Sequence, residues 1–385
     1  MNLLKRDFLQ NTIRIFSLFL LVVFVVVLAG CAKSEMQEII PSNYTQESYT
    51  YETIDEGEES VDKEEEKDKN EDISNENKHQ DSILAEEELL KYKANELGSV
   101  MILMYHQIGG TEAKWMRKPQ NFRRDLLNLY ENDYRLISLL DYVNGNIDIE
   151  AGKSPVVITF DDATQGQFNY VETDEGIELD PDCAVAILED FYSDYPDFGK
   201  AATFYIYYPY PFQQEQYINT KLEFLVQNGY EIGNHTYSHV DLTKISDLNI
   251  IKELALQSGK TNEILPGYEV RSLALPYGQY PKNKDLLTQG SYMNYSYINE
   301  AVLLIGSNPA PSPFSSDFDP LNIPRIIASE IMVEGMGIYN WIDYFKEYPD
   351  RRYVSDGNIN MVSAPQELSQ KLNKESAEAR KVYFY

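Results

Sequence analysis

The strongest constraint on the fold is a series of short, mostly apolar runs. They occupy residues 100–105, 156–160, 201–207, 230–234 and 273–275. Runs of this length and composition are typical of parallel strands that are buried on both faces of a sheet. Between them, apolar residues recur at helical spacing, as at Phe122, Leu126 and Leu129. The sequence therefore predicts strands that alternate with helices.

Polar side chains stand directly after several of these runs. His106 follows the first, Asp161 and Asp162 follow the second, and His235 follows the fourth. Strand–helix alternation over most of the chain favours an α/β barrel. Barrel enzymes place their chemistry at the carboxyl ends of the strands. We therefore expect these residues to meet at one end of the barrel.

The residue types suggest a metal site. His235 and His239 are four residues apart, and one carboxylate from the Asp161–Asp162 pair would complete the three-ligand set of a catalytic zinc-type centre. The other aspartate is then free to act as a general base. Each motif alone has a simpler explanation, since a histidine pair can be a surface coincidence and an aspartate pair can form a turn or a helix cap.

Together, the two motifs resemble those of the polysaccharide deacetylase family (NodB homology, carbohydrate esterase family 4). The chain reads Thr-Phe-Asp-Asp at 159–162 and His-Thr-Tyr-Ser-His at 235–239, and the similarity extends from about residue 101 to 326. The resemblance implies a distorted (β/α) barrel in which Asp161 is the base. It also implies that Asp162, His235 and His239 bind a divalent metal, with Zn²⁺ the expected ion.

A third family motif is only partly present. Where the family has an arginine that orients the base, this chain has Ala274, followed by Leu-Pro-Tyr-Gly at 275–278. Another group must then hold Asp161, or activity is reduced. The resemblance implies that the backbone N–H of Tyr277 faces the oxyanion. Alternatively, Tyr277 only closes a Pro-Tyr-Gly turn.

The usual C-terminal histidine motif is absent, because no histidine follows His239. Instead, Leu-Met-Tyr-His stands at 103–106, at the end of the first run. This arrangement resembles a circularly permuted branch that deacetylates poly-N-acetylglucosamine, as do residues 121–126 and 321–326. The resemblance implies that His106 is the general acid. The alternative is that His106 is a structural, hydrogen-bonded residue.

The N-terminal region predicts export and lipidation. A basic stretch precedes an apolar run at 15–28, and Leu-Ala-Gly-Cys follows at 28–31. We interpret residues 1–30 as a lipoprotein signal peptide and Cys31 as the lipidated residue. The alternative is an uncleaved transmembrane helix. Cys183 would remain as a single cysteine in an apolar helical pattern, which favours a core position.

Residues 31–97 differ sharply in composition from the rest of the chain. Charged and amide residues dominate there, and the whole chain has a formal net charge of −29. Such a segment buries too little apolar area to fold, so we expect a disordered acidic tether that precedes a catalytic domain at 98–385. The acidic balance argues against nucleic acid as a partner. The expected location is the extracytoplasmic face of the cell membrane, through the lipid anchor.

These observations favour a metal-dependent hydrolase that removes N-acetyl groups from an extracellular amino-sugar polysaccharide, of the poly-N-acetylglucosamine or peptidoglycan type. Two alternatives remain open. The missing arginine motivates a catalytically inactive, sugar-binding lipoprotein on the same barrel. A polysaccharide O-acetyl esterase would use the same residues.

Overall fold

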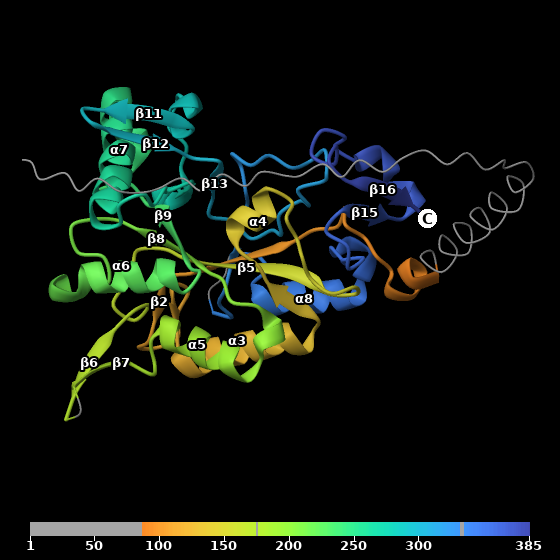
Figure 1. The fold of residues 1–385 in the computed structure, drawn as a ribbon, viewed down its shortest axis with the longest axis horizontal. Helices are drawn as coiled ribbons and strands as arrows, with labels where there is room; N and C mark the ends of the chain where they lie inside the picture. The colour runs from red at the N-terminus through yellow and green to blue at the C-terminus, as the bar shows by residue number, and fades with distance from the viewer. Residues whose placement is uncertain (1–86, 175, 332–334) are drawn as a thin grey trace, which may run out of the picture. The chain divides into compact units, whose positions relative to one another are not determined.

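The structure is a computed structural model that describes residues 87–174, 176–331 and 335–385. The predicted signal peptide at 1–30, the lipidation site Cys31 and most of the predicted tether lie outside the described residues. The central element is a parallel sheet (Figure 1). Its strands are β1 (Met101–Tyr105), β4 (Tyr134–Leu136), β5 (Ser154–Phe160), β8 (Thr203–Ile206), β9 (Glu231–Asn234), β10 (Ser272–Ala274), β13 (Ala301–Leu303) and β14 (Ile326–Ile327).

The sheet curls toward closure. Its order is β13-β10-β9-β8-β5-β1-β14, with β4 beside β5. The segment that leads into β14 contacts both ends of this order. Ile323 pairs with Leu303 of β13 in a parallel bridge, and Ile326 pairs with Leu103 of β1. This segment therefore spans the gap between the first and last strands, and the predicted distorted α/β barrel is confirmed.

Six α-helices that lie wholly within the described residues surround the sheet. Apolar residues of four of them, α3, α5, α6 and α8, form one continuous core with one face of the strands. α7 packs with β10, β13 and the hairpin of β11 (Gln289–Tyr292) and β12 (Tyr295–Ile298) in a separate cluster (Figure 1). The helices are α3 (Pro119–Glu131), α4 (Leu139–Val143), α5 (Ala184–Asp194), α6 (Ile218–Gln227), α7 (Asp247–Ile264) and α8 (Ile338–Glu347).

Four two-stranded sheets lie outside the central sheet. Two are antiparallel hairpins and two are parallel pairs. The hairpins are β6 (Tyr170–Thr173) with β7 (Gly176–Leu179), and β11 (Gln289–Tyr292) with β12 (Tyr295–Ile298). The parallel pairs are β2 (Gln107–Ile108) with β3 (Met116–Arg117), and β15 (Met361–Ala364) with β16 (Lys381–Phe384). The β6–β7 hairpin falls within a polar, acidic insertion, residues 164–182, that follows Asp162.

Alternation along the strands separates a helix-facing side from an interior side. In β5, Ile158 and Phe160 belong to the core that contains the helices, whereas Val157 packs in the other cluster with Tyr205 and Ala274. Successive strand residues point to opposite faces. Thr159 therefore shares the interior side, and Asp161 continues it beyond the end of the strand.

The folded domain begins earlier than residue 98. Ala94, Asn95 and Glu96 are buried, and the backbone of Asn95 pairs with that of Val354. The prediction that the tether extends to residue 97 is therefore too long at its C-terminal end, because these residues satisfy their backbone polar groups against the domain. Cys183 is buried just before α5, so the predicted core position is confirmed.

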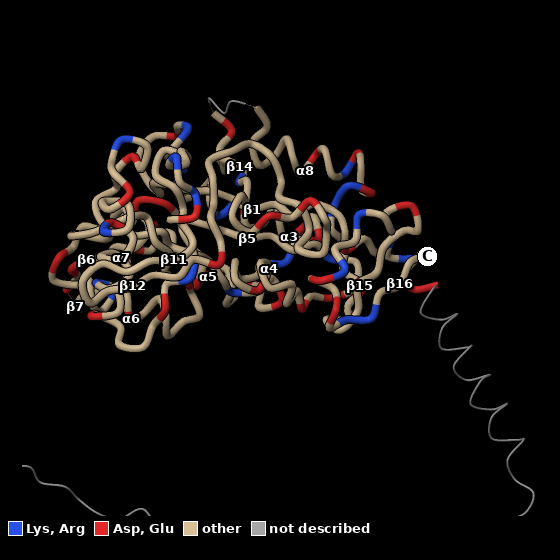
Figure 2. Tube along the Cα trace, turned by 90° about the horizontal axis from the view of Figure 1, so that it is seen from above, with Lys and Arg blue, Asp and Glu red and all other residues tan. Residues whose placement is uncertain are grey.

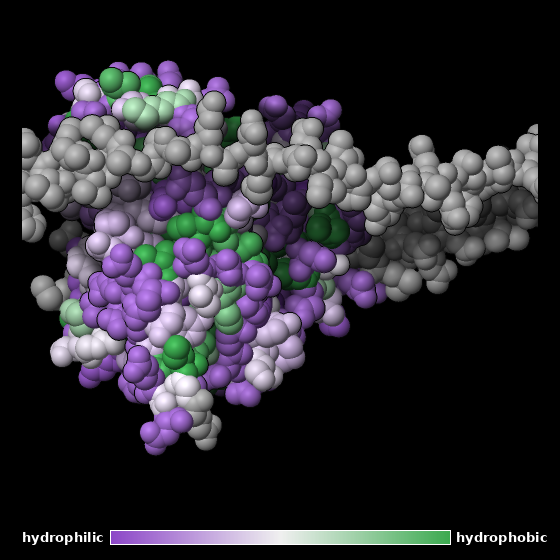
Figure 3. All heavy atoms as spheres, turned by 60° about the vertical axis from the view of Figure 1, so that its left-hand side comes forward, coloured by the Kyte–Doolittle hydropathy of each residue, from purple (hydrophilic) through white to green (hydrophobic). Residues whose placement is uncertain are grey.

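The described surface is mixed in charge and polarity. Lys and Arg are interspersed with Asp and Glu along the trace (Figure 2). On the face shown in Figure 3, apolar residues form areas that polar residues border. Within residues 87–174, 176–331 and 335–385, no helix combines the length and the apolar character needed to cross a bilayer.

Glu96 generates a prediction about stability and pH. Burial, and then the charge of Asp356, raise the pKa of Glu96 from 4.5 to about 8. Its contribution to stability is therefore fully present below about pH 4.5 and is lost as the pH rises through 8. We expect Glu96→Gln to reduce the fall in the free energy of unfolding between pH 5 and 8. Urea denaturation of both proteins measures this, and identical pH slopes would contradict it.

Candidate active site

The register of the strands brings the predicted site residues together. Tyr105 pairs with Phe160, so His106 and Asp161 leave neighbouring strands at the same level. Asn234 pairs with Ile206 of β8 and Leu273 of β10, which places His235 at the same edge of the sheet. His106, Asp161 and His235 therefore lie at the carboxyl ends of neighbouring strands, as expected.

Asp162, His235 and His239 form a compact cluster. One potential ligand atom from each lies within 4.8 Å of the others. Oδ1 of Asp162 is 3.4 Å from Nε2 of His235 and 3.1 Å from Nε2 of His239. Burial alone would raise the pKa of Asp162, but the two neighbouring imidazoles, when protonated, lower it below its ordinary value through hydrogen bonds and charge. The cluster therefore holds Asp162 as a carboxylate.

The hydrogen bonding of His235 tests whether this cluster fits a cation. Its Nδ1 is 2.9 Å from the carbonyl oxygen of Ala274, which can only accept, so in the neutral ring Nδ1 carries the proton. Nε2 then presents a lone pair toward the Asp162 carboxylate. Two electron-rich atoms facing each other need a positive charge between them, and a backbone carbonyl on the far ring nitrogen is typical of metal-ligating histidines. The residues fit a divalent metal.

Left-handed backbone conformations are concentrated around the cluster. The φ angles are 75° at Asp162, 60° at Thr236, 54° at His239 and 61° at Tyr277. Residues other than glycine adopt this region at a cost, and such residues gather at active sites. At Asp162, the reversal turns its side chain away from the direction that regular strand alternation would give it. Both adjacent aspartates can then serve the same site.

The loop that carries the two histidines is anchored by side chains. Oδ1 of Asn234 accepts from the backbone N–H of Thr236 at 2.8 Å. Glu253 on α7 accepts from the N–H of Ser238 at 2.8 Å and from its hydroxyl at 3.0 Å. Because His235–His239 is not helical, these bonds, rather than a helical repeat, set the separation of the two imidazoles.

Arg325 holds the proposed base. Its guanidinium donates two hydrogen bonds of 2.7 Å to the two carboxylate oxygens of Asp161. It also donates to Oγ1 of Thr159 at 3.0 Å and, through Nε, to the carbonyl of Leu304 at 2.8 Å. Arg325 and Asp161 are 0% and 2% exposed. This bidentate pair supplies the contact that the sequence lacks at Ala274.

The ion pair sets the charge of Asp161. Burial alone would raise its pKa, but the charge of Arg325, with that of His235, and the hydrogen bonds from Arg325 lower it below the ordinary value. Asp161 is therefore a carboxylate fixed in orientation on both oxygens. The hypothesis of an inactive sugar-binding protein rested on the missing arginine. Because Arg325 makes the contact with Asp161, this reason no longer applies.

His106 lies beside the two aspartates. Burial lowers its pKa, and the charges of Asp161 and Asp162 oppose this shift. Its ring contacts the ring of Trp115 in a tilted arrangement, with centroids 4.6 Å apart. Nδ1 is buried and lacks a hydrogen-bond partner in the described part of the chain. The alternative, that His106 is a structural, hydrogen-bonded residue, is therefore not supported by a hydrogen bond to its Nδ1 among the described residues.

Tyr277 borders the cluster from the turn after β10. Its ring is 56% exposed and meets His239 edge-on, with centroids 5.1 Å apart. The ring of Tyr207 also contacts that of His239, with centroids 5.3 Å apart. Residues 275–278 form a tight turn with Tyr277 in the left-handed region, and the N–H of Gly278 donates to the carbonyl of Leu275 at 2.9 Å. The turn thus brings the Tyr277 ring beside a candidate ligand.

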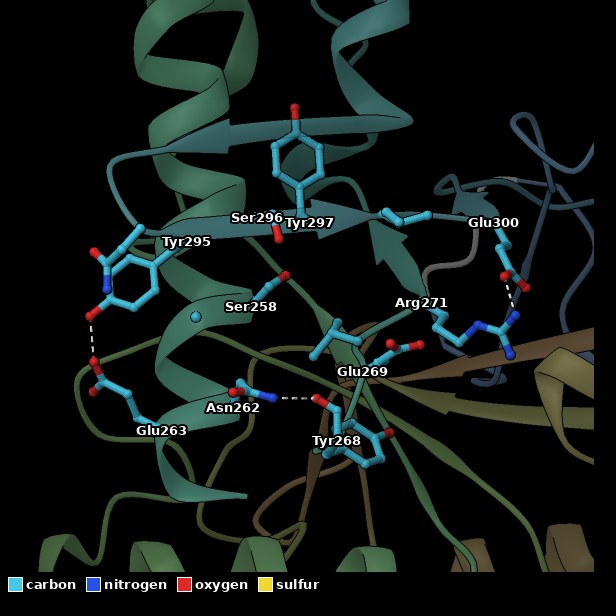
Figure 4. A pocket seen from close by; sticks show the side chains of 14 residues that line it. Ser258, Asn262, Glu263, Tyr268, Glu269, Arg271, Tyr295, Ser296, Tyr297 and Glu300 are labelled. Atoms are coloured by element: carbon cyan, nitrogen blue, oxygen red, sulfur yellow. Dashed lines mark hydrogen bonds and ion pairs between the residues drawn. The ribbon is translucent and has the colours of Figure 1, made fainter. Parts of the chain in front are cut away.

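A separate cavity of about 530 Å³ lies between α7 and the β11–β12 hairpin. It contains none of the predicted site residues. Several of its polar side chains already satisfy one another (Figure 4). Tyr295 donates to Glu263, Arg271 pairs with Glu300, and Asn262 donates to the carbonyl of Tyr268. The candidate active site is therefore the cluster at the strand ends, not this cavity.

Sequence reasoning missed two residues that organise the site. Arg325 was noted only within a segment similar to the permuted branch, and its partner could not be assigned because it lies 164 positions from Asp161. The available signal in the sequence was that Arg325 lies between Pro324 and the apolar pair Ile326–Ile327, which form a short strand. Gln167 also contacts the backbone of the site, and no sequence pattern distinguished it from the neighbouring polar residues.

Arg325 gives a stability prediction. Arg325→Ala leaves a buried carboxylate without its partner, so we expect the free energy of unfolding to fall by about 3–5 kcal/mol. Arg271→Ala breaks the partly exposed pair with Glu300 and is the matched control, with an expected change of about 0–1 kcal/mol. Chemical denaturation measures both. Equal losses of unfolding free energy in the two variants would contradict a larger cost for breaking the buried Arg325–Asp161 pair.

Comparison with known proteins finds similarity to polysaccharide deacetylases. Residues 148–298 match the family model described as polysaccharide deacetylase. The deacetylase PplD of Streptococcus pyogenes, solved in complex with acetate, is 18% identical, with 64% of this chain and 97% of that chain covered and a TM-score of 0.46. IcaB from Ammonifex degensii is 16% identical, with the same coverage and a TM-score of 0.46. BC0361, a polysaccharide deacetylase from Bacillus cereus, is 20% identical, with 64% and 68% covered and a TM-score of 0.45.

The matched residues include Asp161, Asp162, His235, His239 and Tyr277, whereas His106 and Arg325 lie outside them. The family model thus spans the predicted metal ligands and the predicted base. Residues 148–298 thus match the polysaccharide deacetylase family, and this match supports a hydrolase that acts on carbon–nitrogen bonds other than peptide bonds.

Proposed function

We propose that this protein removes N-acetyl groups from an extracellular amino-sugar polysaccharide in a metal-dependent reaction. The observation that carries the proposal is the Asp162–His235–His239 cluster beside a second carboxylate, Asp161, which Arg325 holds on both oxygens. A cluster of ligands with an adjacent fixed base is the arrangement that hydrolysis of an unactivated amide requires.

Asp162, His235 and His239 would hold the metal. When bound, a divalent ion supplies Lewis acidity and lowers the pKa of water at the site. Asp161 would accept the proton of the attacking water as the new carbon–oxygen bond forms. Its lowered pKa keeps Asp161 ionised at neutral pH, so that it can accept a proton. The two hydrogen bonds from Arg325 prevent rotation of the carboxylate.

His106 would donate the proton that the departing amine needs. Without that proton an amine anion would have to leave, which is prohibitive. The lowered pKa of His106 makes its protonated form a stronger acid, although a less populated one. The backbone N–H of Tyr277 would stabilise the oxyanion of the tetrahedral intermediate. The products would be acetate and a glucosamine-type residue.

Poly-N-acetylglucosamine and peptidoglycan glycan strands are the proposed substrate classes. The position of His106 after the first strand, as in the permuted branch, supports the former class. Exposed aromatic side chains near the cluster, Trp115 and Tyr277, offer ring faces on which sugars can stack. A lipid at Cys31 and an acidic tether would hold the domain at the extracytoplasmic face of the membrane, within reach of such polymers.

Metal content tests the proposed ligands. After stripping with a chelator and reloading with zinc, we expect about one equivalent per chain, and loss of binding in His235→Ala. His79→Ala, a histidine of the predicted tether, is the control and should retain the metal. Acetate release from N-acetylated glucosamine oligomers should disappear on stripping and return on reloading. Full release by the stripped protein would contradict metal dependence.

His106→Ala tests the acid. The variant should keep its metal, because His106 is not one of the three ligands, and should lose about 10²- to 10⁴-fold in kcat for an N-acetyl substrate. Acetate release under saturating substrate measures kcat, and metal analysis of the same sample excludes loss of the site. Unchanged turnover would show that another group donates the proton.

A further inference from the structure

Gln167 joins the two loops that carry the proposed acid and base. Its Nε2 donates to the carbonyl of His106 at 2.7 Å and to the carbonyl of Asp161 at 2.5 Å. The side chain is 0% exposed, and Oε1 is buried with no partner among the residues that the structure describes. One amide group is thus hydrogen-bonded to the backbone of both residues.

The orientation of this amide follows from its partners. Both partners are carbonyl oxygens, which accept hydrogen bonds and cannot donate them. The reversed amide would place Oε1 against two other oxygens, so only the NH₂ group fits between them. Each of its two hydrogens serves one loop.

The segment around Gln167 is itself firmly held. The backbone carbonyls of Gly166 and Gln167 accept from Ala184 and Val185, at the start of α5, at 3.0 Å each. A Cβ at Gly166 would come within 1.7 Å of the carbonyl oxygen of Ile108, so the chain passes against β2 with no room for a side chain. Gln167 therefore reaches the site from a fixed support.

The two residues depend on Gln167 to different degrees. Asp161 has further anchors, because Arg325 holds its carboxylate and its N–H donates to the carbonyl of Tyr105 at 2.9 Å. His106 has its ring contact with Trp115 but no side-chain hydrogen bond within the described residues. Loss of the Gln167 amide should consequently displace the acid more than the base.

We propose that Gln167 is a positioning residue that fixes His106 relative to Asp161 for protonation of the leaving amine. The inference rests on the proposed function and assigns a role to the polar insertion after the base. Small displacements of a reacting group cost rate, by up to about 10²-fold for 1 Å. A displaced acid should slow amide hydrolysis, which needs the proton, more than hydrolysis of an aryl ester, whose leaving group does not.

The test compares two substrates in the full-length, zinc-loaded protein. Gln167→Met keeps the length of the side chain without its donors, and Gln167→Asn is a second variant that keeps the amide but is one methylene shorter. We expect kcat for an N-acetylglucosamine oligomer to fall about 10- to 100-fold, and kcat for 4-nitrophenyl acetate to change less than about 3-fold. Gln165→Met is the matched control, because Gln165 is exposed and bonds only to Asn169 among the described residues.

A double-mutant cycle adds a readout that a general structural role would not give. In a His106→Ala background, Gln167→Met should cause no further loss on the amide substrate. Equal losses on both substrates, additive losses in the cycle, or unchanged kinetics would each overturn the inference. A wild-type protein that hydrolyses neither substrate would instead overturn the proposed function, and this inference with it.

Discussion

The buried ion pair between Arg325 and Asp161 is the interaction on which the site depends. Replacing water around two charges is costly, and such a pair persists only where the geometry is good and the remaining donors are used. Here the guanidinium donates to both carboxylate oxygens, to Thr159 and to the carbonyl of Leu304. The pair is better explained by the need for a fixed, ionised base than by a gain in stability.

The same pair links the site to the fold. Arg325 stands in the segment that bridges β13 and β1, and Asp161 follows β5. The contact that orients the base is therefore made only when the sheet has curled far enough to bring this segment beside β1. In this way the arginine acts from a part of the chain remote from the motif where the family usually carries it.

Local apolar runs predicted five of the eight strands of the central sheet, β1, β5, β8, β9 and β10, and with them the barrel. The rule that parallel strands present their carboxyl ends at one edge predicted that the polar residues meet there. The choice of Asp162, rather than Asp161, as a ligand with His235 and His239 came from the resemblance to a known family. Arg325 and Gln167 could not be assigned, because their partners are fixed by tertiary packing rather than by spacing. The start of the domain was also misplaced, because the burial of Glu96 depends on contacts with Tyr353 and Ser363 near the other end of the chain.

The central claim is that a fixed carboxylate beside a metal-binding cluster hydrolyses an N-acetyl group. Its most direct test is acetate release from an N-acetylated glucosamine polymer by the zinc-loaded wild-type protein and by Asp161→Asn, which keeps the shape of the side chain but removes its basicity. The account predicts release by the wild type and almost none by the variant, with equal metal content in both. Release by Asp161→Asn at the wild-type rate, or none by the wild type, would contradict it.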